Sequence, residues 1–192
     1  MFKPILFNTD MVRAILEGRK TVTRRPIKPQ PAGELRRMGE DSCYPGYFAA
    51  AGEDRVYRPP YMVGDVLYVR ETWSTSDGSY LYRAWPGEGM EPENQDWAMR
   101  EMGLKWRPSI HMPREAARIF LRVTDVRVER LQDINLDPTG PENQVIKEGL
   151  RYLCDFIAVW QNTLKRTDWP VYGWDANPWV WVIEFERITK EE

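Results

Sequence analysis

The chain has 192 residues, of which 27 are Lys or Arg and 29 are Asp or Glu, so its net charge is only −2. This balance excludes a protein that is basic over its whole surface, and 42% hydrophobic residues argue against a disordered chain. The length predicts a single domain over residues 1–192. The sequence has no membrane-length apolar run and no signal peptide, and two cysteines with one histidine are too few for a zinc site. We therefore expect a reduced, cytoplasmic protein that uses no metal or cofactor and does not bind a membrane.

The first 25 residues predict a strand, a helix and a second strand. Residues 4–7 are apolar, and Asn8 or Thr9 can cap a helix whose apolar face includes Met11 and Ile15. Gly18 stands where a left-handed residue ends such a helix. Residues 21–25 are extended in pattern, until Pro26 ends them.

The next part of the sequence predicts two insertions separated by a hairpin. Residues 26–64 hold six prolines and five glycines, which predicts an irregular segment. Residues 65–73 follow as a strand, and residues 80–84 are a candidate hairpin partner across a turn rich in Ser, Gly and Asp. The acidic stretch 86–103 predicts a second surface insertion.

The last third of the chain predicts curved strands and short helices. Within residues 119–128 the apolar alternation changes phase near Thr124–Asp125, as a β-bulge would produce. Residues 141–147 and 152–164 predict two helices, and residues 179–188 predict the final strand. We expect an α+β protein built on a small, partly open β-barrel.

Positive charge is concentrated in two segments. Residues 13–37 carry eight basic residues against two acidic ones, and residues 105–130 carry seven against three. This distribution is compatible with a positive cleft on a nearly neutral molecule, and equally with charges spread over a solvated surface.

Residues 18–25 (GRKTVTRR) are the densest chemical segment. Arginine and lysine side chains suit phosphate or carboxylate groups, and a lysine in a dry pocket can act as a general base for a nearby hydroxyl. A basic helix end exposed at the surface is the alternative interpretation of the same residues.

The order of motifs along the chain resembles the ASCH domain family, a branch of the PUA-like proteins, and in particular its phage- and prophage-associated group. The resemblance covers nearly the whole chain outside the two insertions. It rests on the following residues: Gly18-x-Lys20-x-x-x-Arg24, residues 64–73, 105–113, 117–121 and 131–134, Glu148-Gly149, and residues 177–185.

One branch of this family hydrolyses N(4)-acetylcytidine with a lysine, a threonine three positions later and a downstream glutamate. Lys20, Thr23 and Glu148 stand at the matching positions. The general family pattern has glutamate where this chain has Thr23, which favours the amidohydrolase branch. The resemblance implies that Lys20 deprotonates Thr23, that Thr23 attacks the acyl carbon, and that Glu148 protonates the leaving amine or positions water.

The spacing of Lys20 and Thr23 sets a geometric condition on this mechanism. On a regular strand, residues 20 and 23 point to opposite faces, because their separation is odd. The two side chains can meet only where the backbone bends between them, and the turn after Gly18 permits this.

Other side chains are candidates for binding the substrate or a nucleic acid. Among them, the aromatic Trp73 can equally be a core residue. The set is Arg19, Arg24, Arg25, Arg70, Glu71, Trp73, Arg114 and Arg118.

Three functions remain open at this point. The first is hydrolysis of an N-acylated pyrimidine nucleoside or a related modified base. The second is non-catalytic binding of single-stranded nucleic acid, with RNA favoured over DNA. The third is an accessory phage protein whose insertions bind another protein.

Overall fold

The structure, a computed structural model, describes residues 2–84, 95–134, 136 and 143–189. The chain forms two compact units: unit 1 comprises residues 1–19, 66–122 and 187–192, and unit 2 comprises residues 20–65 and 123–186. Of the described residues, 28% are in helices and 32% in strands, which confirms the predicted α+β class. The single domain over residues 1–192 stays a prediction.

Five strands form one mixed sheet in the order β1 (Phe2–Leu6), β6 (Val66–Arg70), β9 (Phe120–Arg130), β10 (Trp179–Ile188) and β2 (Val22–Pro26). Because β1 and β2 are its edges, the described strands form an open sheet and not a closed barrel. Among the helices of the described residues, none is long and apolar enough to cross a bilayer.

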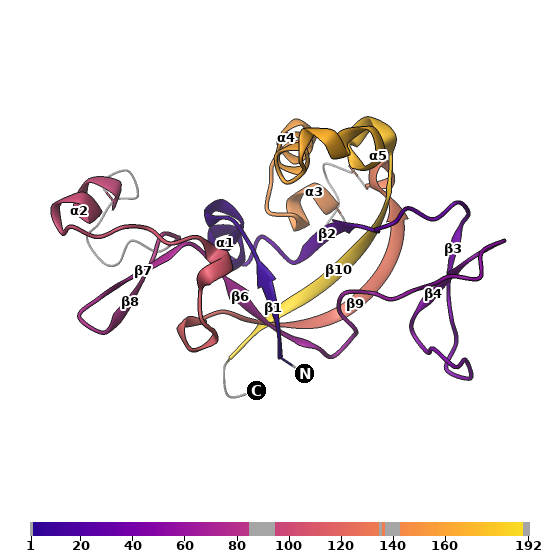
Figure 1. Cartoon of the computed structure of the whole chain (residues 1–192), viewed down its shortest axis with the longest axis horizontal. Helices are drawn as coiled ribbons and strands as arrows, with labels where there is room; N and C mark the ends of the chain where they lie inside the picture. Colours follow the sequence, from indigo (N-terminus) through magenta and orange to yellow (C-terminus); the bar gives the residue numbers. More distant parts are fainter. Residues whose placement is uncertain (1, 85–94, 135, 137–142, 190–192) are drawn as a thin grey trace. The chain divides into compact units, whose positions relative to one another are not determined.

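Unit 1 contains a parallel strand pair, one longer helix and a hairpin (Figure 1). Strand β1 pairs in parallel with β6, and β6 pairs antiparallel with the first residues of β9. Its main elements are β1 (Phe2–Leu6), α1 (Thr9–Leu16), β6 (Val66–Arg70), β7 (Trp73–Ser76), β8 (Ser79–Tyr82) and α2 (Gln95–Glu101). Two 3-10 turns follow, at Ser109–His111 and Arg114–Ala116, before β9 (Phe120–Arg130) begins.

Local signals place α1 where the sequence predicts it, but the predicted hairpin is wrong in its pairing. Strand β8 pairs with β7, which lies mostly inside the predicted turn, while β6 pairs with β1 and β9. The Asn8 side chain accepts a hydrogen bond from Met11 N (2.8 Å), so Asn8 is the N-cap of α1. The helix is followed by Gly18 at φ +74°, a conformation that glycine adopts without strain. Strands β7 and β8 are joined by Asp77–Gly78, both at positive φ, which is the chemistry of a tight hairpin turn.

Unit 2 contains the antiparallel pair β2–β10 and a layer of short helices. Strand β10 pairs with β2 so that Val182 lies opposite Arg24. The elements are β2 (Val22–Pro26), β3 (Leu35–Arg37), β4 (Phe48–Ala50), β5 (Val56–Tyr57), α3 (Gln144–Lys147), α4 (Leu153–Asn162), α5 (Trp169–Tyr172) and β10 (Trp179–Ile188). Single 3-10 turns lie at Leu131–Asp133, Arg166–Asp168 and Trp174–Ala176.

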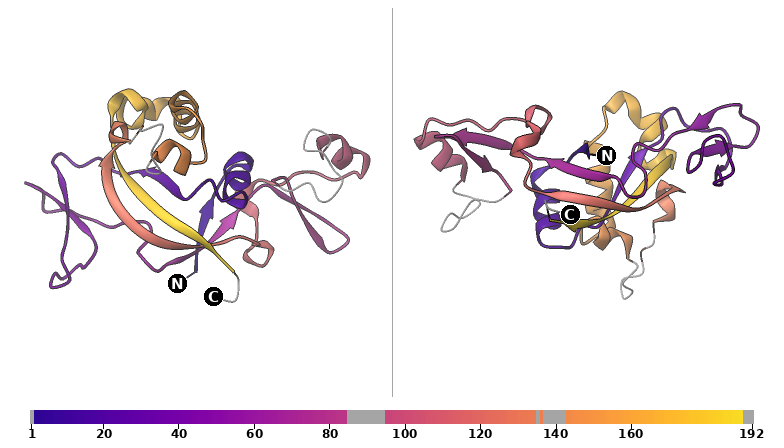
Figure 2. Two further views of the ribbon diagram at one scale, coloured as in Figure 1. Left: turned by 180° about the vertical axis from the view of Figure 1, so that it is seen from behind. Right: turned by 90° about the horizontal axis from the view of Figure 1, so that it is seen from below.

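The helices of unit 2 cover the sheet and close its core. In Figures 1 and 2, α3, α4 and α5 lie on one side of the long strands β9 and β10. The side chains beneath them are Val22, Leu131, Ile134, Val145, Phe156, Trp160, Val180 and Val182, all buried. Helix α4, predicted over residues 152–164, thus buries the side chains of Phe156 and Trp160.

The two predicted insertions are described to different extents. The segment 26–64, predicted as irregular, contains the antiparallel sheet β3-β4-β5, whose strands bury Leu35, Phe48 and Tyr57. The prediction missed it because each strand has only two or three residues. The second insertion, 86–103, is described only from residue 95, where α2 begins; residues 86–94 lie outside the described part.

The burial of Val182 in the core of unit 2 predicts how much its truncation destabilises the protein. Val182→Ala removes two methyl groups from a fully buried position, and we expect it to lower the free energy of unfolding by about 2 kcal/mol. The matched control is Val171→Ala, since Val171 is 49% exposed, and its effect is expected within about 0.5 kcal/mol. Urea unfolding followed by circular dichroism measures both; equal losses would contradict the assigned core.

Candidate functional site

Lys20 and Glu148 meet inside unit 2, although they are 128 positions apart in the sequence. Lys20 Nζ lies 2.6 Å from Glu148 Oε2, and the two side chains are 0% and 5% exposed. The ammonium also donates to the backbone oxygens of Glu148 (3.0 Å) and Val22 (2.8 Å). Backbone contacts hold the pair, because Lys20 and Glu148 form a β-bridge and Thr21 N donates to Lys147 O.

The surroundings of Lys20 weaken its hold on a proton. Burial lowers its pKa below the ordinary value of 10.5, and the nearby Arg25 and Arg24 cations lower it further. Glu148 acts in the opposite direction, but burial is the larger effect. A lysine in this state can act as a general base more readily than one in water.

Arg24 is the second cation that contacts Glu148. Its Nη1 lies 3.1 Å from Glu148 Oε1, and its Nη2 lies 3.2 Å from Glu129 Oε2. Nη2 also donates to the side-chain oxygen of Gln144. Arg24 is only 3% exposed, and its contact with Glu148 is buried, while its contacts with Glu129 and Gln144 are partly buried.

Thr23 and Arg25 form the other part of the cluster. Arg25 Nη1 donates to Thr23 Oγ1 (2.8 Å), and Thr23 is 1% exposed. Burial lowers the pKa of Arg25, while the charge of Glu148 raises it, so Arg25 acts electrostatically on the same carboxylate. Because residues alternate along β2, Thr23 and Arg25 lie on the strand face opposite to Arg24.

The backbone between Lys20 and Thr23 decides whether the two side chains can meet. Thr21 O accepts from Phe185 N (2.9 Å), which continues the pairing of β2 with β10 as far as Thr21. Gly18 has a positive φ, Lys20 forms an isolated bridge, and the regular strand begins only at Val22. The Lys20 ammonium bonds the carbonyl of Val22, whose peptide unit directly precedes Thr23. A direct contact between Lys20 and Thr23 stays a prediction.

Glu129, Gln144 and Arg127 belong to this cluster but were missed by the sequence analysis. Arg127 contacts Glu129 (2.6 Å), and it also contacts Asp125 and Glu184 (3.0 and 2.6 Å). These ion pairs raise the pKa of Arg127. Sequence offered no signal for them, because single charged residues on a strand or a short helix are common on any surface.

The remaining predicted binding residues lie in unit 1, where they contact other residues of the same unit. Glu71, 1% exposed, forms two hydrogen bonds with Arg118 (2.9 and 3.0 Å), and Arg118 lies over the Tyr82 ring. Arg70 donates to Ile110 O, Arg114 lies over Phe2, and Arg19 pairs with Glu17. Trp73 is 5% exposed and packs with Met112 and Phe120, with Arg107 near its ring. Their roles in binding stay predictions.

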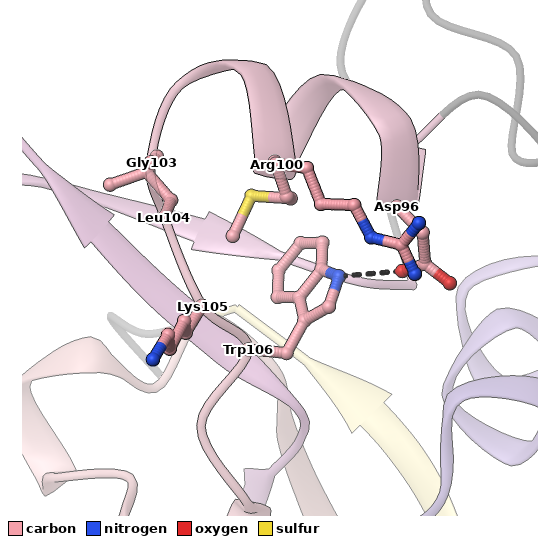
Figure 3. A pocket seen from close by; sticks show the side chains of 7 residues that line it. Asp96, Arg100, Gly103, Leu104, Lys105 and Trp106 are labelled. Atoms are coloured by element: carbon pink, nitrogen blue, oxygen red, sulfur yellow. Dashed lines mark hydrogen bonds between the residues drawn. The ribbon is translucent and has the colours of Figure 1, made fainter.

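A separate pocket of about 470 Å³ lies beside α2 in unit 1. Figure 3 shows the Trp106 indole in it, with a hydrogen bond from Trp106 Nε1 to Asp96 Oδ1 (2.9 Å). None of the predicted catalytic residues lines this pocket. Its lining consists of Asp96, Met99, Arg100, Gly103, Leu104, Lys105 and Trp106.

The chain was compared with protein-family models, with curated proteins and with solved structures, and none of the three comparisons gave a match. In the described part of the chain, no group of three or more His, Cys, Asp and Glu side chains could hold a metal ion.

The lowered pKa of Lys20 predicts how stability changes with pH. Between this pKa and 10.5, the unfolded chain holds more protons than the folded protein, so the free energy of unfolding increases as pH rises. Lys20→Met removes this contribution. We expect the free-energy difference, wild type minus variant, to increase over this pH range.

Lys165→Met is the matched control, because Lys165 is exposed in the same unit. Urea unfolding at several pH values measures both differences. A wild-type advantage over Lys20→Met that stays constant or falls toward pH 10.5 would show that burial does not lower the lysine pKa.

Proposed function

We propose that the protein is a metal-independent amidohydrolase that acts on an N-acylated pyrimidine nucleoside or a related modified base. The observation that carries the proposal is the buried contact between Lys20 and Glu148 at 2.6 Å. The Lys-x-x-Thr motif and the downstream glutamate of the ASCH amidohydrolase branch supply the roles. Membership of that family, with its partly open barrel, is part of the proposal.

The reaction begins when neutral Lys20 takes the proton of the Thr23 hydroxyl, and Thr23 Oγ1 attacks the acyl carbon. Arg25, which donates to Thr23 Oγ1 (2.8 Å), stabilises negative charge on that oxygen. The proton passes from Lys20 across the short contact to Glu148, which delivers it to the leaving amine as the C–N bond breaks. Water then hydrolyses the acyl-threonine ester, releasing the acid and restoring Thr23.

The test of this proposal is hydrolysis of N(4)-acetylcytidine by the purified protein, followed by ultraviolet absorbance. Thr23→Val removes the nucleophile without changing side-chain shape, and we expect kcat/KM to fall about a thousandfold or more. Glu148→Gln retains the hydrogen-bonding shape but not the acid, and a fall of about 10²- to 10⁴-fold is expected.

Thr21→Val is the matched control, since Thr21 is exposed and two positions away. It is expected to keep wild-type activity. Hydrolysis that survives Thr23→Val would rule out threonine as the nucleophile, and no hydrolysis of acylated cytidines by the wild type would overturn the proposed function.

Binding of single-stranded RNA is a second candidate, favoured by aromatic and basic side chains in the segment 26–64. The Tyr44 and Tyr47 rings stack with centroids 5.8 Å apart, and Tyr44 is 51% exposed. Arg58 lies over the Tyr47 ring at 5.9 Å, and Arg36 and Arg37 on β3 are exposed. Exposed aromatic rings beside cations are the usual platform for unpaired bases.

Tyr44→Ala tests this candidate, with Tyr152→Ala as the control because Tyr152 is 64% exposed elsewhere in unit 2. Loss of one stacked base costs about 1–3 kcal/mol, so affinity for an RNA oligonucleotide is expected to fall about five- to 150-fold. Fluorescence anisotropy at increasing salt measures this affinity. Equal affinities of the two variants, or an affinity that does not change with salt, would exclude this surface.

A further inference from the structure

Glu148 depends on other residues for its position. It directly follows α3, a helix of four residues from Gln144 to Lys147, and it caps that helix at its C-terminal end. The Asn143 side chain caps the other end, accepting from Val145 N (3.0 Å) and Ile146 N (3.2 Å). A single helical turn has almost no stability of its own, so contacts with the sheet must fix it.

Arg24 supplies such contacts from β2. Gln144 and Glu148 are four positions apart, which places their side chains on one face of the helical turn. The Arg24 guanidinium binds both, through Nη2 to Gln144 Oε1 and through Nη1 to Glu148 Oε1 (3.1 Å). Arg24 therefore fastens both ends of α3 to β2, the strand that begins two residues after Lys20.

The two carboxylate oxygens of Glu148 are divided between two cations. Oε2 faces Lys20 at 2.6 Å and Oε1 faces Arg24 at 3.1 Å. The second guanidinium nitrogen of Arg24 is anchored by Glu129 (3.2 Å), which Arg127 holds in turn (2.6 Å). This arrangement fixes the rotation of the carboxylate, so that one oxygen alone is directed at Lys20.

The sharing of Glu148 between two cations also determines how its negative charge is compensated. A lysine that acts as a base must first be neutral, and a buried carboxylate whose only cation becomes neutral would lose its compensation. An arginine guanidinium keeps its charge at any pH where proteins are folded. Arg24 can thus compensate Glu148 during the step in which Lys20 carries no charge.

We infer that Arg24 is a positioning residue, which orients Glu148 toward Lys20 and compensates its charge while Lys20 is neutral. This inference rests on the proposed hydrolase function for its catalytic meaning. The coupling of the three side chains can be measured without it.

The experiment compares Arg24→Met and Arg24→Lys with Arg166→Met, in which the substituted arginine is exposed in unit 2 and serves as the control for lost charge. The first readout is an NMR titration of the Lys20 side-chain ammonium, assigned with Lys20→Met. Because the Arg24 cation lowers the pKa of Lys20, Arg24→Met is expected to raise that pKa, and Arg166→Met to leave it unchanged.

The second readout is hydrolysis. Arg24→Met is expected to lower kcat about 10- to 100-fold with little change in KM, and to move the rising limb of the pH–rate profile to higher pH. Arg24→Lys keeps the positive charge, but a single ammonium group cannot bind all three acceptors as the guanidinium does. This variant is therefore expected to keep the rising limb at its wild-type pH and to retain only part of the wild-type kcat. A merely structural role would lower the folded fraction and leave the pH profile in place.

The outcomes separate the two proposals. An unchanged titration of Lys20 in folded Arg24→Met overturns the inference. If Arg24→Met does not fold, Glu129→Gln, which loosens the anchor of Arg24, must shift the same titration, and no shift there also overturns it. A wild type that hydrolyses no acylated cytidine, with the shift present, removes the hydrolase function and retains the coupling.

Discussion

The buried contact between Lys20 and Glu148 is the interaction on which the interior of unit 2 depends. Two charges that are 0% and 5% exposed can stay in an apolar interior only if nearby polar groups compensate them. The matching partners come from separate segments: β2 supplies Arg24, β9 supplies Glu129 and α3 supplies Gln144. The requirement to satisfy one ion pair thus ties a strand, a one-turn helix and a distant strand together.

The apolar core and the charged cluster share the same strands. In β2, Val22 enters the core beneath α4 while Arg24, two positions later, reaches Glu148. Val182, opposite Arg24 on β10, is also part of that core. The charged side chains therefore sit at the margin of a rigid apolar layer, which is the environment that lowers the pKa of a lysine and holds hydrogen-bond geometry.

Sequence reasoning succeeded where the signal is local. Asn8 caps α1, Gly18 follows its end, and the strand 179–188 has the predicted bounds, because each follows from neighbouring residues. Val123 and Val126 are both buried although three positions apart, which agrees with the predicted change of phase between them. The family motif placed Lys20, Thr23 and Glu148 in one site, but it did not predict that Lys20 pairs directly with Glu148.

The missed features all depend on contacts between distant parts of the chain. Glu129 looks like any strand carboxylate until Arg24, 105 positions away, is seen beside it. The strands β3, β4 and β5 are too short for a periodic signal and become stable only by pairing with one another. Trp73 was a candidate stacking surface, and its burial at 5% follows from packing against Met112 and Phe120, which no local pattern reports.

Stability alone is a poor explanation for the charged cluster. Well-packed apolar residues of similar volume usually stabilise a protein interior as much as a buried ion pair does, because the pair must first lose its hydration. Unit 2 nevertheless places Lys20, Arg24 and Glu148 side by side, with an arginine that holds the carboxylate independently of the lysine. Arg24 also pairs with Glu129, so Lys20 and Arg24 together face two carboxylates. Under the proposed hydrolase function, Arg24 keeps its charge when Lys20 loses its proton, so that Glu148 stays compensated during proton transfer.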